Sequence, residues 1–341
     1  IIRMPNPIYL DHNATTPVAE AVADAMSDAL RKVYGNPSSS YAPGQTAATA
    51  IADARQALAS LIGGNADELI FTGCATEANN LALLGVARAA AADKRHLIIS
   101  AVEHPAVMAP ARYLESQRWA LTVIPVDEYG RVSAEAVVDA VTPDTALVSV
   151  MLANNEVGTL QPVAEISRLL KGRNVLLHTD AAQAVGKLPV NVDDLGADLL
   201  TVAGHKFQAS KGIGALYVRG GTPVRNILFG AGHERGLRPG TENVPAIIGL
   251  GAAARLASQR LASRDDRLRR HRDQLHERLL SGIPDLALNG HSDHRLPNTL
   301  NVSFPGVTGK ALLAAASETV LASVGSACHS DDEGPSGVLG A

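Results

Sequence analysis

The sequence predicts an α/β protein: a mainly parallel sheet flanked by helices, with a smaller α+β domain. Short apolar runs alternate with helical stretches through the middle of the chain, as in βαβ units. The runs are apolar almost without interruption, which is expected of strands that are buried on both faces. With 341 residues, 46% of them hydrophobic, the chain can form two domains with a substantial core.

The amino-terminal part is expected to contain a strand over 8–17 and helices over 18–33 and 45–62. The first helix is predicted from apolar residues at helical spacing, namely Val22, Met26, Leu30 and Val33. A strand over 68–72 leads through small residues into a helix that opens at Thr76. This order directs backbone N–H groups and the positive end of the helix dipole at one spot, where a phosphate group binds well.

The middle of the chain is expected to supply five further strands. They cover 96–102, 121–126, 145–152, 174–180 and 198–203, with helices over 105–118, 133–142 and 162–171 between them. Ligands of such sheets bind beyond the carboxyl ends of the strands. The polar residues just past these ends should therefore converge on one crevice: Thr76, Glu103, His104, Asn154, Asn155, Glu156, Asp180, Gln183 and Lys206.

The last third of the chain is expected to form the smaller unit. A long helix begins near Pro245, and its charged part over 258–278 is interpreted as a solvated connecting helix because acidic residues are interleaved with basic ones. We predict a large domain over 15–255 and a small domain that combines 1–14 with 256–341. The small domain should contain a strand, a helix and a second strand, over 298–304, 308–317 and 320–324.

Composition argues against several classes of function. The net charge of −4, from 30 basic and 34 acidic residues, indicates neither a nucleic acid nor an anionic membrane as partner. No apolar run approaches the roughly 20 residues of a membrane span, and no signal peptide is recognisable. We therefore expect a cytoplasmic protein. No metal is expected, because the His and Cys residues lack ligand spacing, and GxGxxG does not occur.

Three residues at predicted strand ends are candidates for chemistry. Lys206 is poorly solvated there, which favours the neutral amine needed for a Schiff base; a surface lysine in a hairpin is the alternative. Asp180 needs a cationic partner, such as the protonated pyridine nitrogen of pyridoxal phosphate; capping of a following helix is the alternative. His104 can stack on a flat ring or carry a proton, or it is a structural histidine, as we assume for His178.

Cys328 is the fourth candidate. Small residues flank it and His329 follows it in a Ser-, Gly- and Asp-rich stretch, so the thiol is expected to be exposed on a mobile segment. An incidental surface cysteine is the alternative. Cys74 is the only other cysteine, and so sparse a pair does not indicate a structural disulfide.

These residues lie in segments that resemble the pyridoxal-phosphate-dependent cysteine desulfurases and selenocysteine lyases of the class V aminotransferase group. The resemblance covers nearly the whole chain. Its segments are YLDHNATTP, YGNPSS, FTGCATEANNLAL, VEHPAV, MLANNEVGTLQP, HTDAAQAVGK, GHKFQASKGIGALYVR, GHERGLRPGTEN, LPNTLNVSF and SVGSACHSD. The resemblance implies the fold type I of pyridoxal-phosphate-dependent transferases, with a mainly parallel seven-stranded-type sheet.

The resemblance also implies how the cofactor ring would be held. Lys206 would form the Schiff base with pyridoxal 5'-phosphate, and Asp180 would pair with the pyridine nitrogen. His104 would stack on the ring, and Gln183 would bond its phenolic oxygen. All four residues match motif positions of the family.

The same resemblance assigns the phosphate and the substrate. The backbone of Ala75 and the side chains of Thr76 and His205 would hold the phosphate, with Thr241 reaching in from the second subunit of a homodimer. Asn155 would contact the substrate. Cys328 would attack the sulfur of L-cysteine, giving alanine and a protein persulfide for a sulfur-acceptor or scaffold protein in iron–sulfur cluster or thio-cofactor supply.

Three features depart from the family pattern. Ala203 replaces a serine that commonly contacts the phosphate, and Cys74 replaces a glycine of the phosphate turn, where a side chain could be crowded. Family members also continue beyond the position of Ala341 with a segment whose arginine binds the substrate carboxylate, and nothing in this sequence matches it. Substrate binding would be weakened without that arginine.

Several functions stay open at the level of sequence. Selenocysteine lyase is the nearest alternative, with L-selenocysteine as substrate, because Ala203 and the segment VLASVGSACHSD resemble that branch. A general β-lyase or aminotransferase with an idle Cys328 is a second alternative. A catalytically silent scaffold that binds sulfur-assembly partners is the alternative from another class.

Overall fold

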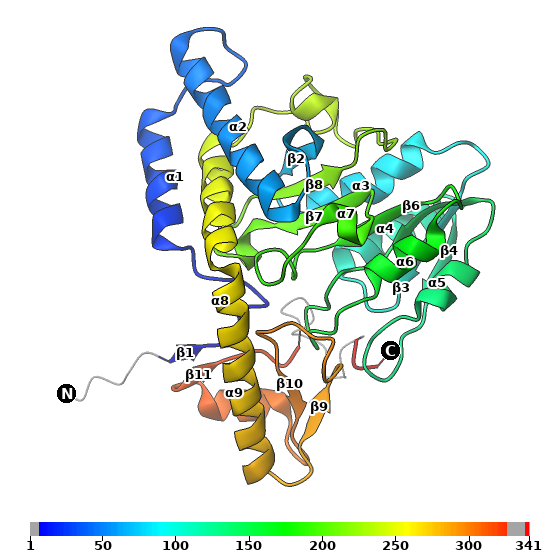
Figure 1. Cartoon of the computed structure of the whole chain (residues 1–341), viewed down its shortest axis with the longest axis vertical. Coiled ribbons are helices and arrows are strands. Elements are labelled where there is room, and N and C mark those ends of the chain that lie inside the picture. Colours follow the sequence, from blue (N-terminus) through cyan, green and yellow to red (C-terminus); the bar gives the residue numbers. More distant parts are fainter. Residues whose placement is uncertain (1–6, 326–337, 341) are drawn as a thin grey trace.

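The computed structural model of the chain describes residues 7–325 and 338–340. Figure 1 shows a large upper part built around a sheet and a smaller lower part with short strands. One long helix, α8 (Val244–Gly282), runs along both parts. Residue 255, where the predicted large domain ends, lies inside this helix, and the division into 15–255 and 1–14 with 256–341 stays a prediction.

The upper part contains a seven-stranded sheet in the order β2-β8-β7-β6-β5-β3-β4. Strands β3 to β7 pair in parallel, whereas β8 is antiparallel to both β7 and β2. The α/β fold class with a mainly parallel sheet is therefore confirmed. The strands are β2 (Leu69–Thr72), β3 (His96–Ser100), β4 (Ala120–Ile124), β5 (Thr145–Ser149), β6 (Leu176–Asp180), β7 (Leu199–Ala203) and β8 (Gly214–Val218).

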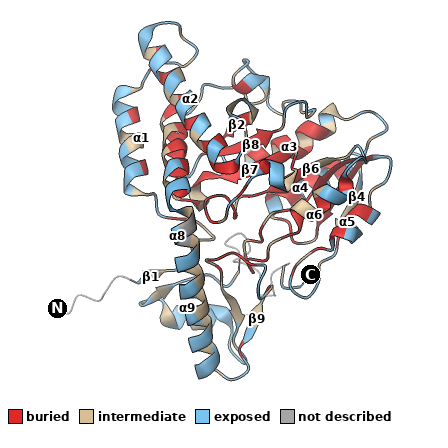
Figure 2. Ribbon diagram, viewed as in Figure 1, coloured by how far each residue is buried: buried red, intermediate tan, exposed pale blue. Residues whose placement is uncertain are grey.

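Helices cover both faces of this sheet. Successive residues of a strand point to opposite faces, so one strand packs against both helix layers. In β3, Leu97 and Ile99 pack with α3 and α4, whereas Ile98 packs with α5 and α6. Near β7 and β8 the second face is covered by α2 and α8. Figure 2 shows the buried residues concentrated in this layer. The helices are α2 (Ala42–Ile62), α3 (Ala75–Ala89), α4 (Pro105–Ser116), α5 (Ala134–Asp139), α6 (Val163–Leu170) and α7 (Val192–Leu195).

The amino-terminal helix α1 (Glu20–Lys32) corrects one expectation. It packs on α8 through Val22, Met26 and Ala29, and a Cβ on Gly249 of α8 would lie 2.6 Å from Met26 Cγ. Leu30 was expected on the same face but is 69% exposed. Leu30 follows the buried Ala29 by one residue, about 100° around the helix, which turns its side chain away from α8.

The lower part consists of two small sheets and α9 (Gly309–Ala316). Strand β1 (Ile8–Tyr9), shorter than the expected 8–17, pairs in parallel with β11 (Val320–Leu321). Strand β10 (Asn301–Ser303) pairs with β9 (Ala287–Asn289), which was not predicted. An isolated bridge between Thr159 and Arg295 connects this part to a loop of the upper part.

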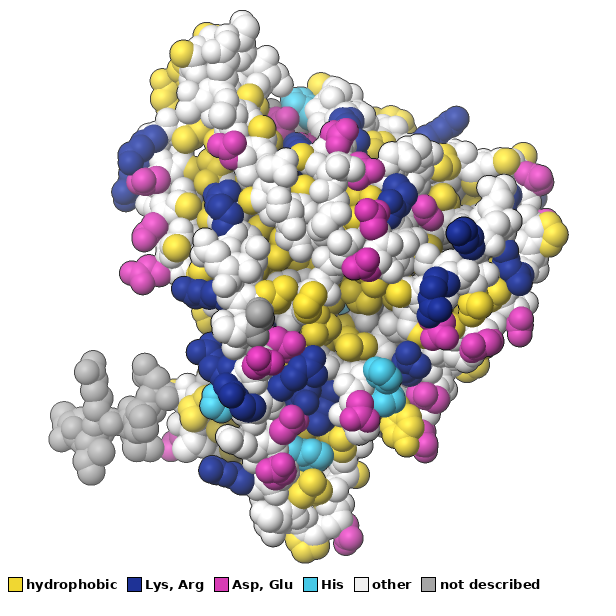
Figure 3. Space-filling view, in the orientation of Figure 1, with side chains coloured by type: hydrophobic (Ala, Val, Ile, Leu, Met, Phe, Trp, Pro, Cys, Tyr) yellow, Lys and Arg dark blue, Asp and Glu magenta, His cyan; other side chains and the backbone are white. Residues whose placement is uncertain are grey.

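The surface carries no strongly one-sided charge on the face drawn in Figure 3, where Lys and Arg side chains are interspersed with Asp and Glu. This distribution agrees with the small net charge of −4. Among the helices that the structure describes, none is both long enough and apolar enough to cross a membrane.

Candidate active site

The candidate site lies at the carboxyl edge of the sheet, as predicted from the strand pattern. Ala203 at the end of β7 and Thr72 at the end of β2 are both paired with Gly214, the first residue of β8. Asp180 ends the neighbouring strand β6. The chain segments that leave β2, β6 and β7 therefore begin side by side, and each carries candidate residues.

Lys206 lies immediately after β7 in a short 3-10 turn, η2 (Gly204–Lys206). It is half-buried, and its Nζ donates to the backbone carbonyls of Asn13 and Ala14, the second at 2.9 Å. Thr16 fixes the turn from the same side, because its N and Oγ1 both donate to the carbonyl of His205, at 3.0 and 2.9 Å. The residues before α1 thus hold the lysine in place, and the hairpin-surface alternative does not describe it.

Asp180 is buried, with 5% of its surface exposed. Its Oδ2 accepts from Asn79 Nδ2 at 2.7 Å, and its Oδ1 accepts from the backbone N of Ala182 at 2.9 Å. No helix begins after it, so the carboxylate caps a turn instead. Within residues 7–325 and 338–340 no lysine, arginine or histidine forms an ion pair with it. Two neutral donors leave a buried carboxylate able to accept a cationic ligand group.

Glu103 is a second buried carboxyl group near this edge. Its Oε1 accepts from Ser100 Oγ at 2.6 Å and from Met151 N at 2.8 Å, while Oε2 has no hydrogen-bond partner among the described residues. Burial raises the pKa of Glu103 to about 8, against the lowering effect of these two hydrogen bonds, and Asp180 adds to the rise. Glu103 is therefore protonated at neutral pH.

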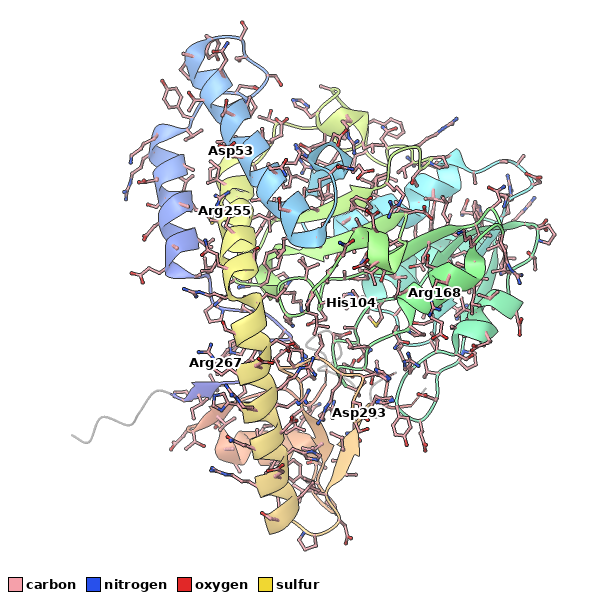
Figure 4. All side chains as sticks on the ribbon, viewed as in Figure 1. Asp53, His104, Arg168, Arg255, Arg267 and Asp293 are labelled. Carbon is pink, nitrogen blue, oxygen red and sulfur yellow. The ribbon has the colours of Figure 1, made fainter. Side chains whose placement is uncertain are left out.

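The structure brings His104 and Thr76 together. Both line a pocket of about 410 Å³ between α3 and α4, with Asn80, Pro105 and Tyr113. His104 is the N-cap of α4, and its Nδ1 accepts from the backbone N of Ala106 at 3.1 Å, which fixes the ring. In Figure 4 His104 lies between the sheet and the lower part of the molecule.

The amino end of α3 forms a cradle of backbone N–H groups that starts at Ala75 and Thr76. A Cβ on Gly214 would lie 2.7 Å from the carbonyl carbon of Cys74 and 2.9 Å from Ala75 N, so only glycine lets this turn rest on β8. Cys74 has φ −174° and ψ 173°, an extended conformation open to any residue. The backbone at Cys74 therefore does not require the glycine that is usual at this position.

His205 lies beside this cradle, in the same turn as Lys206. Its Nδ1 is 3.1 Å from Thr15 Oγ1. Burial, together with the positive charges of Lys206, Lys211 and Lys187, lowers the pKa of His205 to about 4. At neutral pH His205 is uncharged and can donate one N–H to an anion. The preceding Ala203 is buried and brings no hydrogen-bond donor in its side chain.

Gln183 is joined to Lys206 through Asn13, which sequence reasoning missed. Gln183 Nε2 donates to the Asn13 carbonyl at 2.9 Å, and that carbonyl also accepts from Lys206. The side chain of Asn13 donates to the Asn155 carbonyl at 3.1 Å. A second residue without a predicted role, Lys187, donates to Gln183 Oε1 at 2.6 Å and to Asn13 Oδ1 at 3.0 Å.

Three other residues named from the sequence have different outcomes. Asn154 is buried and shapes its own loop, since its Oδ1 accepts from the N atoms of Glu156 and Val157 at 2.8 and 3.0 Å. Thr241 is exposed in the loop before α8, and none of its hydrogen bonds in the described chain joins it to another site residue. Cys328 lies outside the described residues.

His178 packs inside the sheet, in agreement with its assignment. It is fully buried and forms hydrogen bonds with Ser149 Oγ at 2.8 Å and Thr201 Oγ1 at 3.1 Å, one on each neighbouring strand. Burial lowers the pKa of His178 to about 4. The part of the chain that the structure describes contains no group of His, Cys, Asp and Glu residues suited to a metal ion.

The chemistry of these groups fits pyridoxal phosphate. Asp180 offers a buried carboxylate for a protonated pyridine nitrogen. The amino end of α3 and the uncharged His205 offer N–H donors to a phosphate group. Lys206 offers an amine to a carbonyl carbon. Gly214 has no side chain, and a Cβ at this position would displace the N–H cradle at the amino end of α3.

The chain belongs to the class-V aminotransferase family, whose model matches residues 8–336. The cysteine desulfurase IscS of Dictyoglomus turgidum is 44% identical over 339 residues, which cover 99% of this chain and 86% of that protein. Among solved structures, a NifS-like protein superimposes with a TM-score of 0.88 at 37% identity, over 92% of this chain and 87% of that one. The structure of SspA in complex with cysteine gives 0.84 at 34% identity, over 97% and 93%.

Proposed function

We propose that this protein is a pyridoxal-phosphate-dependent cysteine desulfurase that converts L-cysteine to L-alanine and a protein persulfide. The main support is the arrangement at the carboxyl edge of the sheet. Lys206, the buried Asp180 and the amino end of α3 lie on chain segments that leave this edge side by side. The relative from Dictyoglomus turgidum is a cysteine desulfurase, and the similar protein SspA was solved in complex with cysteine. Both observations support cysteine as the substrate.

Each site residue has a chemical task in this reaction. Lys206 holds the cofactor and removes the proton from the substrate Cα, and Asp180 keeps the pyridine nitrogen protonated. When bound, the cofactor supplies the electron sink for that step. Ala75 N, Thr76 and His205 bind its phosphate, while His104 stacks on its ring.

The remaining tasks concern the substrate and the sulfur. Gln183 donates to the phenolic oxygen of the cofactor, and Asn155 contacts the substrate. The Cys328 thiolate attacks the substrate sulfur, so that an S–S bond forms and the carbon–sulfur bond breaks. The carbon skeleton takes up protons and leaves as alanine, and the sulfur stays on Cys328 until an acceptor protein takes it.

A homodimer is part of the proposal, with Thr241 of one subunit completing the phosphate site of the other. Large aromatic side chains on the upper part support a subunit contact, because surfaces of this kind usually mark interfaces. Phe229 is 83% exposed, Tyr34 79% and Tyr41 60%. Cytoplasmic location and the two-domain division also stay proposals.

Selenocysteine lyase is the second candidate, favoured by Ala203, the residue that departs from the usual serine. Turnover of L-cysteine and L-selenocysteine by wild type and Cys328→Ala separates the two. A desulfurase loses at least 100-fold of its cysteine activity in Cys328→Ala, because the thiolate is the sulfur acceptor. Full cysteine activity in this variant would contradict the persulfide mechanism.

The cofactor is tested independently of turnover. Purified wild type should be yellow, and Lys206→Ala should lose this absorbance because the amine that binds the carbonyl carbon is gone. A colourless wild type that stays inactive with added pyridoxal phosphate would instead favour the silent scaffold. Pyruvate or a keto acid in place of alanine would favour a β-lyase or an aminotransferase.

A further inference from the structure

Lys187 is a buried lysine at the candidate site for which the chemistry above has no use. It is 5% exposed and lies four residues after Gln183, in the turns that follow β6. A buried ammonium group is costly unless its N–H groups are hydrogen-bonded. Lys187 Nζ has two side-chain acceptors, Gln183 Oε1 at 2.6 Å and Asn13 Oδ1 at 3.0 Å. The site thus contains a second lysine, fixed by these two hydrogen bonds, besides Lys206.

The hydrogen bond from Lys187 determines which way the amide of Gln183 points. A lysine can only donate, so the atom it contacts has to be the amide oxygen. The amide nitrogen then points in the other direction, where it donates to the Asn13 carbonyl at 2.9 Å. That carbonyl is also an acceptor for Lys206. Gln183 therefore presents its donor group on the side of the reactive lysine.

Asn13 holds Lys187 in this arrangement because every polar group of its side chain is used. Besides Lys187, its Oδ1 accepts from Asn298 Nδ2 at 2.9 Å. Its Nδ2 donates to the Asn155 carbonyl at 3.1 Å and to Thr299 Oγ1 at 2.9 Å. Two donors on one side and two acceptors on the other leave the Asn13 amide a single orientation.

We propose that Lys187 is a positioning residue for the reaction assigned above: it turns the amide donor of Gln183 toward Lys206 and places a buried positive charge beside that lysine. This inference rests on the proposed function, because it concerns the cofactor site at Lys206. Lys187 acts through Gln183 and through its charge, and it contacts neither substrate nor cofactor in this account.

The surrounding charges give the expected direction of the effect. His205 faces the same region but is uncharged at neutral pH, since its pKa is about 4, and Lys187 is one of the three cations that lower it. Lys211 is exposed and screened by solvent. Asp180, at the end of β6, is a buried carboxylate of the same sheet edge. A buried cation disfavours protonation of the nitrogen of Lys206, so its removal should make that protonation easier.

A pH titration of the absorbance of the bound cofactor in the complete holoenzyme tests this. Lys187→Met removes the charge and both hydrogen bonds and should move the titration midpoint upward by about one pH unit. Lys187→Arg keeps the charge and should titrate close to wild type. Lys171→Met makes the same change in net charge at an exposed position on the turn after α6 and should leave the midpoint where it is.

One further variant tests the charge while a hydrogen bond to Gln183 is kept. Lys187→Gln retains a donor for Gln183 Oε1 without the charge, so it should show the same upward shift, and it replaces Lys187→Met if that variant does not fold. Unchanged midpoints in both neutral variants would overturn the inference while leaving the proposed function intact. A wild type that takes up no cofactor would overturn the proposed function first and the inference with it.

Discussion

At the scale of single residues, Glu103 shows how burial changes the protonation of a carboxyl group at the edge of the sheet. Asp180 accepts one hydrogen bond on each oxygen, whereas both donors to Glu103 bond the same oxygen and leave Oε2 without a partner in the described chain. Burial therefore dominates at Glu103 and raises its pKa to about 8. Two neighbouring buried carboxylates would repel each other, and a protonated Glu103 avoids this.

The raised pKa of Glu103 predicts how stability depends on pH. Its pKa is 4.5 in the unfolded chain and about 8 in the folded one, so the stability it contributes is present below pH 4.5 and is lost as the pH rises through about 8. Glu103→Gln cannot ionise and escapes this loss. Its Tm relative to wild type should increase by about 3 °C or more between about pH 5 and about pH 8.

Thermal unfolding at the two pH values measures this, with the exposed Glu20→Gln as matched control. Glu20 is exposed on α1, and its replacement should give the same small Tm difference at both pH values. A Tm difference for Glu103→Gln that does not grow with pH would contradict the protonated state of Glu103.

The residues that sequence reasoning missed have a common physical reason. Asn13 bonds Gln183, Lys206 and Thr299, which lie 170, 193 and 286 positions away in the chain. Neither its type nor its neighbours indicate these contacts, because they arise only when separate segments meet at the sheet edge. Lys206 and Asp180 were predictable from their places in the sequence. Asp180 ends one apolar run that forms a strand, and Lys206 comes shortly after another.

At the scale of elements, the strands of the large sheet were predictable because short, nearly continuous apolar runs are typical of buried strands. Strand β9 was not, because it is half-exposed and is defined by its pairing with β10. The junction between β2, β8 and α3 was only partly predictable. The sequence placed a small-residue turn there, but the contact of this turn with Gly214 depends on the antiparallel pairing of β8.

This junction gives a prediction for Gly214→Ala. The new Cβ would lie 2.7 Å from the Cys74 carbonyl carbon and 2.8 Å from the Val202 carbonyl oxygen, so backbone has to move on both sides. We expect a loss of about 1–3 kcal/mol in the free energy of unfolding and at least tenfold weaker cofactor binding, since the phosphate cradle is displaced. Denaturant unfolding and cofactor titration measure the two effects.

Gly232→Ala is the matched control, because nothing lies within 4 Å of a Cβ at that exposed position. It should retain both stability and cofactor affinity. If Gly214→Ala behaves like this control, the close approach between the turn and β8 is not required.

At the scale of the whole molecule, the proposed dimer makes the site depend on two chains. Phe229→Asp places a charge on the exposed aromatic surface and should convert a dimer into monomers, because the interface would then have to bury a carboxylate. The monomer should also bind the cofactor at least tenfold more weakly, since Thr241 of the partner is lost. Sedimentation and cofactor titration measure these effects together.

Leu169→Asp is the control, because it also replaces an exposed hydrophobic side chain with a carboxylate, in this case on α6. It should leave the dimer intact. A wild type that is monomeric at micromolar concentration while binding the cofactor fully would contradict the shared site.

The proposed transfer of sulfur from cysteine to Cys328 changes the mass of the protein, so mass spectrometry can detect it. The holoenzyme is treated with L-cysteine in the absence of a reductant and is then digested. The mass of the peptide that contains Cys328 is measured. We expect one extra sulfur atom on Cys328 in wild type, none in Lys206→Ala, and alanine released in equal amount. Alanine formed by wild type with Cys328 unmodified throughout the turnover would contradict it.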